Sequence, residues 1–415
     1  MTIVGLGYVG LPLAQEAARS GIRVTGFDVS DRVVGGLMAG RSHVDDLDGR
    51  DVMRMLDDGF TATTDPACLA ASDAIVICVP TPLSDDGAPD LSAVVGASET
   101  IAAHLRPGTI VVLESTTSPG TTDDVVRPVL EAGSGLTAGV DFHLAFSPER
   151  IDPGKAVYGI RNTPKVVGGH TEACTDRAVE LYERIVDTVV PTVGTREAEM
   201  AKLLENTYRH VNIALMNEMA IFSADLGVDL WAAIEAAKTK PFGYTAFYPG
   251  PGVGGHCIPI DPNYLSFAVR SLGYQFRFVE LAQEISGRMP AYIATRAQSA
   301  LNEAKLAVNG SRILLLGVAY KANLSDERES PARPLAARLQ QMGADVVYFD
   351  PYVERFETEN GDLPRSDDLE SAAATADLVI LVQSHDEIVS SPHLASAARI
   401  LDTRGVLTGP NVERL

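Results

Sequence analysis

The opening of the chain constrains its fold more than any other segment. The stretch TIVGLGYVGLPLAQEAARSGIRVTGFDVS combines an apolar run, a glycine turn, an amphipathic helical pattern and a second apolar run that ends at Asp28. Its glycines, Gly5, Gly7 and Gly10, match the spacing G-x-G-x-x-G. The first glycine of such a turn permits the tight bend, the second admits a pyrophosphate, and the third lets the helix pack on the strand. The segment therefore predicts a strand–turn–helix–strand unit that binds a dinucleotide at the helix N-terminus.

Asp28 selects between the two common nicotinamide dinucleotides. A carboxylate about 20 residues after the glycines binds the ribose hydroxyl pair and repels a 2′-phosphate, so the sequence favours NAD over NADP. Arg32, four residues later, is a nearby cation that favours the opposite choice. The simpler alternative, a glycine turn that only packs, is disfavoured because strand, helix and acid occur together in the expected order.

Further strands are predicted at ASDAIVICVPTP and GTIVVLESTTSPG, with a helical pattern between them. This alternation favours a mainly parallel sheet, whose ligands bind at the C-terminal ends of the strands. Those ends carry Pro80 and Thr81, the run Glu114–Thr117, and Glu149, although serine and threonine at such places often only cap the next helix. The residues expected to contact NAD are Gly5, Gly7, Tyr8, Val9, Gly10, Asp28, Arg32, Pro80, Thr81 and Thr116.

The middle of the chain is predicted to be helical. Apolar residues recur at helical spacing from Arg196 to Val228 without β-branched runs. Lys202 and Asn206 lie four residues apart, hence on one face of this helix, either as a solvated pair or as a pair directed into a site. A further helix is expected from Phe278 to Val308, interrupted or kinked at Met289–Pro290 because proline breaks the backbone hydrogen-bond pattern.

The last part of the chain indicates a second α/β unit. The segment SRILLLGVAYKANLSDERESPARPLAARLQQMGADVVYFDP is followed by apolar runs in ADLVILVQSHDE and ARILDTRG. Its loop lacks a full glycine motif but contains Lys321 and Arg328, which suit a phosphate. We therefore expect an α/β protein with two Rossmann-like parallel-sheet domains joined by a helical central domain, with boundaries at residues 1–195, 196–308 and 309–415.

Composition excludes several classes of protein. A net charge of -21 disfavours a nucleic-acid partner, and no apolar run approaches the ~20 residues of a membrane span. Without a signal-peptide pattern, we expect a cytoplasmic protein that does not bind membranes. Its four cysteines, Cys68, Cys78, Cys174 and Cys257, show no CxxC spacing, so neither a disulfide framework nor a structural zinc site is expected.

The stretch PGPGVGGHCIPIDP surrounds Cys257 with glycines and prolines, which lets the backbone approach a ligand closely. A buried structural cysteine would need neither the glycine turn nor Asp261 four residues later. Metal ligation by Cys257 would have His256 and Asp261 beside it, but adjacent histidine and cysteine side chains diverge, and no further cysteine or histidine cluster completes a four-ligand zinc shell. A nucleophilic thiol is therefore the favoured interpretation.

Motifs in a fixed order cover essentially the whole chain: GLGYVGLPLA, VPTP, ESTTSPGTT, FSPERIDPG, AKLLENTYRHVNIALMNE, PGPGVGGHCIPIDP and GVAYKANLSDERESP. This series resembles the nucleoside-diphosphate-sugar 6-dehydrogenases, which include the UDP-glucose, UDP-N-acetylglucosamine and UDP-N-acetylmannosamine enzymes. The resemblance implies oxidation of a sugar C6 alcohol to a carboxylate with two NAD molecules in turn. It also implies an NAD-binding first domain, a central dimerisation domain that carries the Cys257 loop, and a nucleotide-sugar-binding last domain.

The resemblance also assigns roles to single residues. It makes Cys257 the nucleophile that forms a thiohemiacetal and then a thioester, and Asp261 the group that assists water and proton transfer. Lys202 and Asn206 match the pair that stabilises developing oxyanion charge, while Glu149 and Thr116 match residues linked to thioester hydrolysis. The residues expected at the sugar nucleotide are Glu149, Arg150, Lys202, Asn206, Phe247, Tyr248, Gly254, Lys321 and Arg328.

The substrate is less constrained than the reaction. Ile260 stands where the common UDP-glucose enzymes carry lysine, and the motifs look most like the N-acetylglucosamine branch. UDP-N-acetylglucosamine and UDP-glucose are therefore favoured, with UDP-N-acetylmannosamine or a dTDP-sugar as alternatives. A two-electron hydroxyacid dehydrogenase and a non-catalytic nucleotide-sugar or NAD sensor are the other functions considered. The resemblance further implies a homodimer, in which Arg209, Arg270 or Arg277 could complete the partner's site.

Overall fold

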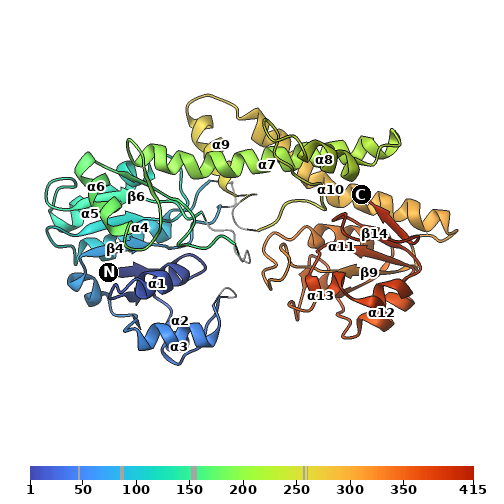
Figure 1. Cartoon of the computed structure of the whole chain (residues 1–415), viewed down its shortest axis with the longest axis horizontal. Coiled ribbons are helices and arrows are strands. Elements are labelled where there is room, and N and C mark those ends of the chain that lie inside the picture. Colours follow the sequence, from blue (N-terminus) through green and yellow to red (C-terminus); the bar gives the residue numbers. More distant parts are fainter. Residues whose placement is uncertain (45–46, 85–87, 151–156, 256–257, 259) are drawn as a thin grey trace. The chain divides into compact units, whose positions relative to one another are not determined.

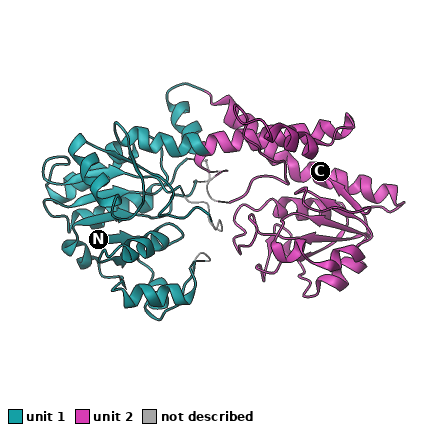
Figure 2. Ribbon diagram, viewed as in Figure 1, with its two compact units in different colours: residues 1–205, 263–274 teal, residues 206–262, 275–415 magenta. Residues whose placement is uncertain are grey.

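The computed structural model describes residues 1–415 except 45–46, 85–87, 151–156, 256–257 and 259. Its described residues form two compact units (Figure 2). Unit 1 contains residues 1–205 and 263–274, and unit 2 contains residues 206–262 and 275–415. Each unit has its own sheet and its own hydrophobic core. The three-domain boundaries expected from the sequence stay a prediction.

The described part of unit 1 is built on an eight-stranded sheet with the order β3-β2-β1-β4-β5-β6-β7-β8 (Figure 1). All neighbouring strands are parallel except β6 and β7, which pair antiparallel. The strands are β1 (Thr2–Val4), β2 (Thr25–Phe27), β3 (Thr61–Thr63), β4 (Ala74–Ile77), β5 (Ile110–Leu113), β6 (His143–Phe146), β7 (Lys165–Gly169) and β8 (Val189–Pro191).

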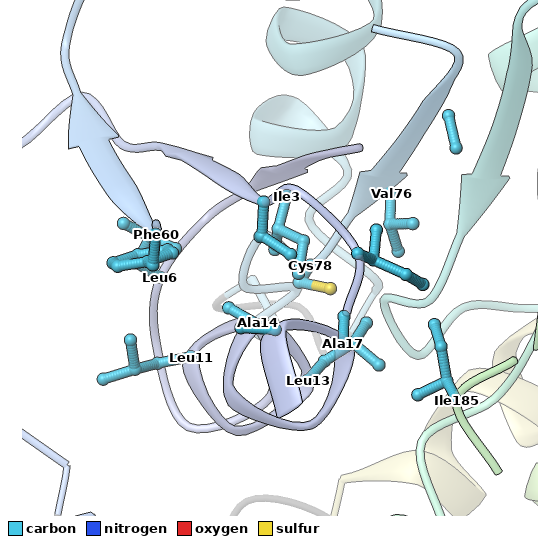
Figure 3. Packing of buried hydrophobic residues seen from close by; sticks show 14 of the residues in the cluster. Ile3, Leu6, Leu11, Leu13, Ala14, Ala17, Phe60, Val76, Cys78 and Ile185 are labelled. Carbon is cyan, nitrogen blue, oxygen red and sulfur yellow. The ribbon is translucent and has the colours of Figure 1, made fainter. Parts of the chain in front are cut away.

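Helices cover both faces of this sheet. The helices of unit 1 are α1 (Gly10–Arg19), α2 (Asp31–Met38), α3 (Gly49–Asp57), α4 (Ser92–Ala102), α5 (Arg127–Ser134), α6 (Glu172–Tyr182) and most of α9 (Asp261–Ser271), with shorter turns η1 (Pro66–Ala71) and η2 (Thr122–Val126). Successive strand residues point to opposite faces, so Ile3 and Val76 join one core and Val4 and Ile77 join the other. Figure 3 shows the first of these cores, where side chains of α1 pack around Cys78.

A long helix, α7 (Thr195–Asp225), begins in unit 1 and continues into unit 2. Unit 2 also contains α8 (Leu230–Lys238), α10 (Arg277–Glu303), α11 (Ala332–Gln341), α12 (Leu369–Thr375), α13 (Asp386–Val389) and the short turn η3 (Pro392–Ser396). Its described sheet is parallel, in the order β10-β9-β13-β14-β15, and a separate hairpin pairs β11 with β12. The strands are β9 (Arg312–Leu316), β10 (Asp345–Phe349), β11 (Glu357–Thr358), β12 (Gly361–Asp362), β13 (Leu378–Leu381), β14 (Ile400–Asp402) and β15 (Val412–Arg414).

These elements confirm the α/β class with two parallel-sheet units and a helical region between them in sequence. The interruption predicted at Met289–Pro290 is wrong, because α10 continues from Arg277 to Glu303 with Pro290 inside it, and the alternative of a kink there stays a prediction. Met289 and Pro290 are both buried, so packing against the unit 2 core offsets the hydrogen bond that proline cannot donate. None of the helices that the structure describes combines the length and the hydropathy of a membrane span.

Candidate active site

The glycine turn between β1 and α1 has the geometry that each of its glycines suggests. Gly5 has a φ of +90, and a Cβ on it would lie 2.8 Å from the carbonyl oxygen of Cys78. A Cβ on Gly10, the first residue of α1, would lie 1.9 Å from the carbonyl oxygen of Gly5. At Gly7, by contrast, no described heavy atom beyond its chain neighbours lies within 4 Å of a Cβ. Gly5 and Gly10 thus permit the tight turn, and Gly7 leaves room for a pyrophosphate.

Asp28 directly follows β2, and its side chain is hydrogen-bonded to the glycine turn. Its Oδ2 accepts a 2.9 Å hydrogen bond from the backbone N–H of Leu6, and its Oδ1 accepts one of 2.9 Å from Ser30. A carboxylate offers about four acceptor positions, so these two bonds leave capacity for a hydroxyl pair. The open space at Gly7 and this acceptor together fit the pyrophosphate and the ribose of NAD.

Thr81 and Thr116 lie together at the ends of β4 and β5. The hydroxyl of Thr81 donates to the carbonyl oxygen of Thr116 at 2.8 Å, and the Thr81 side chain is buried. The hydroxyl of Tyr264 on α9 donates to the carbonyl oxygen of Thr81. Through these two bonds Thr81 joins the backbone after β4 to the backbone after β5 and to α9. The remaining residues predicted near NAD are accessible to varying degrees: Tyr8, Arg32 and Pro80 are exposed, and Val9 packs partly on the core.

Glu149 and Lys202, both predicted at the reaction centre, are in contact within unit 1. The Nζ atom of Lys202 donates to the carbonyl oxygen of Glu149 at 2.5 Å, and the Lys202 side chain is buried on α7. Arg150 beside it donates to Glu205 at 2.6 Å and to the carbonyl oxygen of Pro164 at 2.6 Å. These bonds fasten the Glu149–Arg150 backbone to α7, so the position of the Glu149 backbone is fixed by its neighbours.

Two buried carboxylates support this half of the site. Glu114, at the end of β5, forms a 2.8 Å ion pair with Lys165 and accepts from Tyr182, and burial raises its pKa. Its contacts are with the interior of unit 1, so it supports the sheet edge rather than facing a ligand. Glu199 on α7 accepts from Gly120 and from both the backbone and the hydroxyl of Thr122, and burial raises its pKa to about 7.

Asn206 and Asp261 meet inside unit 2. The amide Nδ2 of Asn206 donates to Oδ2 of Asp261 at 2.5 Å, and the two residues are 6% and 1% exposed. Asp261 is also the first residue of α9, where the partial positive charge of a helix N-terminus favours a carboxylate. Two residues far apart in the sequence, both predicted to be catalytic, are thus brought into one buried hydrogen bond.

The glycine turn that precedes Cys257 packs on the loop that follows β9. The backbone N–H of Gly255 donates to the carbonyl oxygen of Arg328 at 3.0 Å, and a Cβ on Gly255 would lie 2.6 Å from the Tyr320 ring. A Cβ on Gly254 would lie 2.7 Å from Tyr320 as well. The predicted nucleophile Cys257 lies outside the described residues, as does His256.

Phe247 and Tyr248, predicted as a pair around the nucleotide, have different partners. Phe247 meets Tyr208 edge to face, with ring centroids 5.6 Å apart. Tyr248 stacks on Trp231 at 5.8 Å and donates to Glu235 at 2.5 Å. Only part of each side chain is buried, so each ring offers a surface to a ligand, but the two do not form one stack.

Lys321 and Arg328 lie in the loop after β9, as expected. Lys321 is half-buried, and the guanidinium of Arg328 donates through Nε and Nη2 to Asp326, the latter at 2.6 Å. A phosphate at Arg328 would therefore share this guanidinium with Asp326 or displace it.

Three features that lie beside predicted site residues or their loops were not predicted from the sequence. The first is Arg404, a half-buried cation whose Nε donates to the carbonyl oxygen of Val382 at 2.7 Å, and desolvation lowers its pKa to about 10. A Cβ on Gly250 would lie 3.2 Å from its Nη1, so it borders the turn before Cys257. The second is Trp231, which stacks on the ring of Tyr248. The third is the buried pair Asp350 and His385, for which the acid at the end of the strand in VVYFDP was an available signal.

Comparisons with known proteins agree with this geometry. Residues 1–186 match the NAD binding domain of the UDP-glucose/GDP-mannose dehydrogenase family, residues 196–287 match its central domain, and residues 314–409 match its UDP binding domain.

Individual proteins are similar over most of the chain. A UDP-N-acetyl-D-mannosamine dehydrogenase of Pyrococcus horikoshii is 36% identical over 99% of this chain and 97% of its own length. A UDP-N-acetyl-D-glucosamine 6-dehydrogenase of Pseudomonas aeruginosa is 36% identical over 85% of this chain and 83% of its own length. The solved structure of the Pyrococcus horikoshii enzyme superposes with a TM-score of 0.90 at 34% identity, over 100% of this chain and 99% of that one.

Proposed function

Because this chain belongs to the UDP-glucose/GDP-mannose dehydrogenase family, we propose that it oxidises the C6 alcohol of a UDP-N-acetylhexosamine to a carboxylate through a thioester on Cys257. Membership makes the chain an NAD-dependent nucleotide-sugar 6-dehydrogenase. The observation that carries the covalent route is the buried bond between Asn206 and Asp261, because Asp261 follows Cys257 by four residues in the chain.

The proposed reaction balances as two oxidations and one hydrolysis. Bound NAD would supply the hydride acceptor for each oxidation. In the first, the C6 hydroxyl loses its proton and C6 loses a hydride, which gives an aldehyde; the Cys257 thiolate then adds to the aldehyde carbon, and protonation of the oxygen gives a thiohemiacetal. Loss of that hydroxyl proton and of a second hydride from C6 leaves a thioester. Water then cleaves the carbon–sulfur bond, which releases the carboxylate and regenerates the thiol. The covalent bond explains how both oxidations occur without release of the aldehyde.

We assign the groups that this route requires to residues that the structure describes. Asp261, held by Asn206, accepts the proton of the C6 hydroxyl or of the attacking water. Asn206 and Lys202 donate to the oxygen that gains negative charge in each step. Glu149 assists hydrolysis of the thioester, with Thr116 positioning the same water. These roles follow from the family resemblance, and the contacts of Lys202 with Glu149 and of Asn206 with Asp261 support them.

The proposed substrate class rests on the similar enzymes. Those of Pyrococcus horikoshii and Pseudomonas aeruginosa are named for the N-acetylmannosamine and N-acetylglucosamine nucleotides, at equal identity to this chain. Lys321 and Arg328 are the cations proposed to bind the diphosphate. A panel of UDP-N-acetylmannosamine, UDP-N-acetylglucosamine, UDP-glucose and a dTDP-sugar, compared by kcat/KM, tests the assignment. Higher kcat/KM for UDP-glucose than for both N-acetylated sugars would overturn it.

The covalent route is tested by replacing Cys257. Cys257→Ser should almost abolish turnover while NAD and sugar-nucleotide binding persist, because a hydroxyl is a much weaker nucleophile than a thiolate. Cys68→Ser, which changes a half-buried cysteine of unit 1, is the matched control and should retain activity. Normal turnover by Cys257→Ser would exclude the thioester.

Two other functions make different predictions. A two-electron hydroxyacid dehydrogenase would produce one NADH for each substrate, and a nucleotide-sugar or NAD sensor would produce none. Neither function would require Cys257, or the buried acceptor that Asn206 holds in place.

We also propose that the protein is a homodimer formed through its helical segment. Large apolar side chains are exposed there, including Leu215 and Phe222 on α7 and Phe278 and Leu281 on α10. Such a surface is expected to pair with its symmetry mate. Arg209, Arg270 and Arg277 are exposed and remain the candidates for an arginine that reaches the partner's site. Light scattering after size exclusion tests this proposal: an active sample with the mass of one chain would contradict it.

A further inference from the structure

In both units an aspartate directly follows the strand that is second in chain order within the sheet. Asp28 follows β2 in unit 1, and Asp350 follows β10 in unit 2. In each case Oδ2 accepts from a backbone N–H of the turn after the first strand: Leu6 at 2.9 Å for Asp28 and Val318 at 2.7 Å for Asp350. The turns begin with Gly5 and Gly317, whose φ angles are +90 and +73. The two acids therefore occupy the same local position.

Their remaining contacts differ. Oδ2 of Asp350 also accepts from Ala319 at 3.2 Å and from Nε2 of His385 at 3.1 Å. Its Oδ1 accepts from the backbone N–H groups of Tyr352 at 2.8 Å and Val353 at 3.1 Å. Five donors thus fill the roughly four acceptor positions of a carboxylate, and the Asp350 side chain is fully buried. Asp350 cannot bind a ribose hydroxyl pair as Asp28 can, so its function lies in what it holds.

His385 connects this carboxylate to the loop after β9. Its Nδ1 lies 2.9 Å from the backbone nitrogen of Asn323, which can only donate. Nδ1 therefore carries no proton, and Nε2 carries the one that it donates to Asp350. His385 is completely buried and packs against the ring of Tyr352 at 5.0 Å. A single neutral tautomer thus joins Asp350 to the loop.

Neighbouring bonds fasten the same part of the loop. Asn323, which has a left-handed φ of +63, exchanges two 2.9 Å hydrogen bonds with Asp386 through its side-chain amide. Gln383 donates to the carbonyl oxygen of Tyr320 at 2.7 Å. The segment from Tyr320 to Asn323, which includes Lys321, is therefore tied to residues 383–386, which follow the neighbouring parallel strand β13.

We infer that His385 is a positioning residue for nucleotide binding: through Asp350 and Asn323 it fixes the loop that presents Lys321 and Arg328 to a diphosphate. The inference rests on the proposed function of this loop. The same loop also supports the turn before Cys257, because the backbone N–H of Gly255 in that turn donates to the carbonyl oxygen of Arg328. NAD binding depends on unit 1 residues, so it should not depend on His385.

Calorimetric titration of the full chain with UDP, and separately with NAD, tests this inference. His385→Ala should weaken UDP binding by about tenfold or more and leave NAD affinity unchanged. His385→Gln should recover part of the loss, because one amide can accept from Asn323 and donate to Asp350. His393→Ala is the control, since His393 is partly exposed and pairs with Glu370 instead. In turnover, His385→Ala should raise the KM for the sugar nucleotide more than it lowers kcat.

A second variant covers the case in which His385→Ala does not fold. Gln383→Leu removes the bond to the Tyr320 carbonyl and the acceptor of the Ser384 backbone N–H, but none of the five donors to Asp350 described above, and should weaken UDP binding several-fold. Unchanged UDP affinity in folded variants that still bind NAD would overturn the inference. Failure of the unmodified protein to bind UDP at all would instead contradict the proposed substrate class, so the two failures can be told apart.

Discussion

Asn206 donates a hydrogen bond to Asp261 in the interior of unit 2, and this bond ties the middle of α7 to the first residue of α9. A buried carboxylate is unfavourable unless it is paired or hydrogen-bonded. The amide of Asn206 and the N-terminus of α9 both contribute to that requirement. They hold in place the carboxylate that we propose as the proton acceptor of the reaction.

Replacing Asn206 should impair catalysis more than binding. Asn206→Ala removes the donor to Asp261 and one proposed oxyanion donor, so kcat should fall on the order of 10²-fold with a smaller change in KM. Asn212→Ala is the control, because Asn212 lies on the same helix and donates to the carbonyl oxygen of Tyr208. Steady-state kinetics with thermal unfolding of both variants checks this. Equal kcat values for the two folded variants would contradict the role of Asn206.

Cofactor choice should depend on Asp28. The unmodified protein should prefer NAD to NADP by at least about tenfold, and Asp28→Ala should narrow that ratio because the carboxylate both binds the ribose and repels a phosphate. Asp31→Ala, at the exposed start of α2, should leave the ratio unchanged. The ratio of kcat/KM for the two cofactors is the measurement. Equal use of both cofactors by the unmodified protein would count against the ribose contact.

A methyl group on Gly255 should disturb the loop that bears Arg328. The Cβ of Gly255→Ala would meet the Tyr320 ring at 2.6 Å, so we expect kcat/KM for the sugar nucleotide to fall by about tenfold or more. Gly243→Ala has a similar left-handed φ, +67 against +87, but no described atom beyond its chain neighbours within 4 Å of the new Cβ. It should cost only about 1–2 kcal/mol of stability. Similar kinetics for both variants would show that the Tyr320 contact is unimportant.

Glu199 should make stability depend on pH. Burial raises its pKa from 4.5 to about 7, so the folded state holds a proton that the unfolded state releases between these values. Its contribution to the free energy of unfolding should therefore fall by up to about 3 kcal/mol as pH rises from 4.5 to 7, and then level off. Thermal unfolding of Glu199→Gln should lack this component.

The control for this measurement is Glu197→Gln, two residues earlier on the exposed surface of α7. Its pH profile should follow that of the unmodified protein. A Glu199→Gln profile parallel to the unmodified one from pH 4.5 to 7 would show that Glu199 is not the titrating group.

The sequence predicts well what local patterns determine. The glycine turn and Asp28 were predictable because one continuous segment supplies strand, turn, helix and acid. The helix through Pro290 was not, because its stability comes from packing against distant residues of the unit 2 core. The long-range contacts of Asp350 were hidden for the same reason, since its donors Val318 and His385 lie far from it in the chain. Family motifs suggested the roles of Asn206 and Asp261, but only the structure reveals their hydrogen bond.

The number of NADH molecules formed for each nucleotide sugar tests the central claim most directly. With a limiting, known amount of UDP-N-acetylglucosamine or UDP-N-acetylmannosamine, absorbance at completion gives the NADH yield, and mass spectrometry identifies the product. The account predicts two NADH per sugar and a product in which the C6 alcohol has become a carboxylate. One NADH per sugar with a released aldehyde would contradict it.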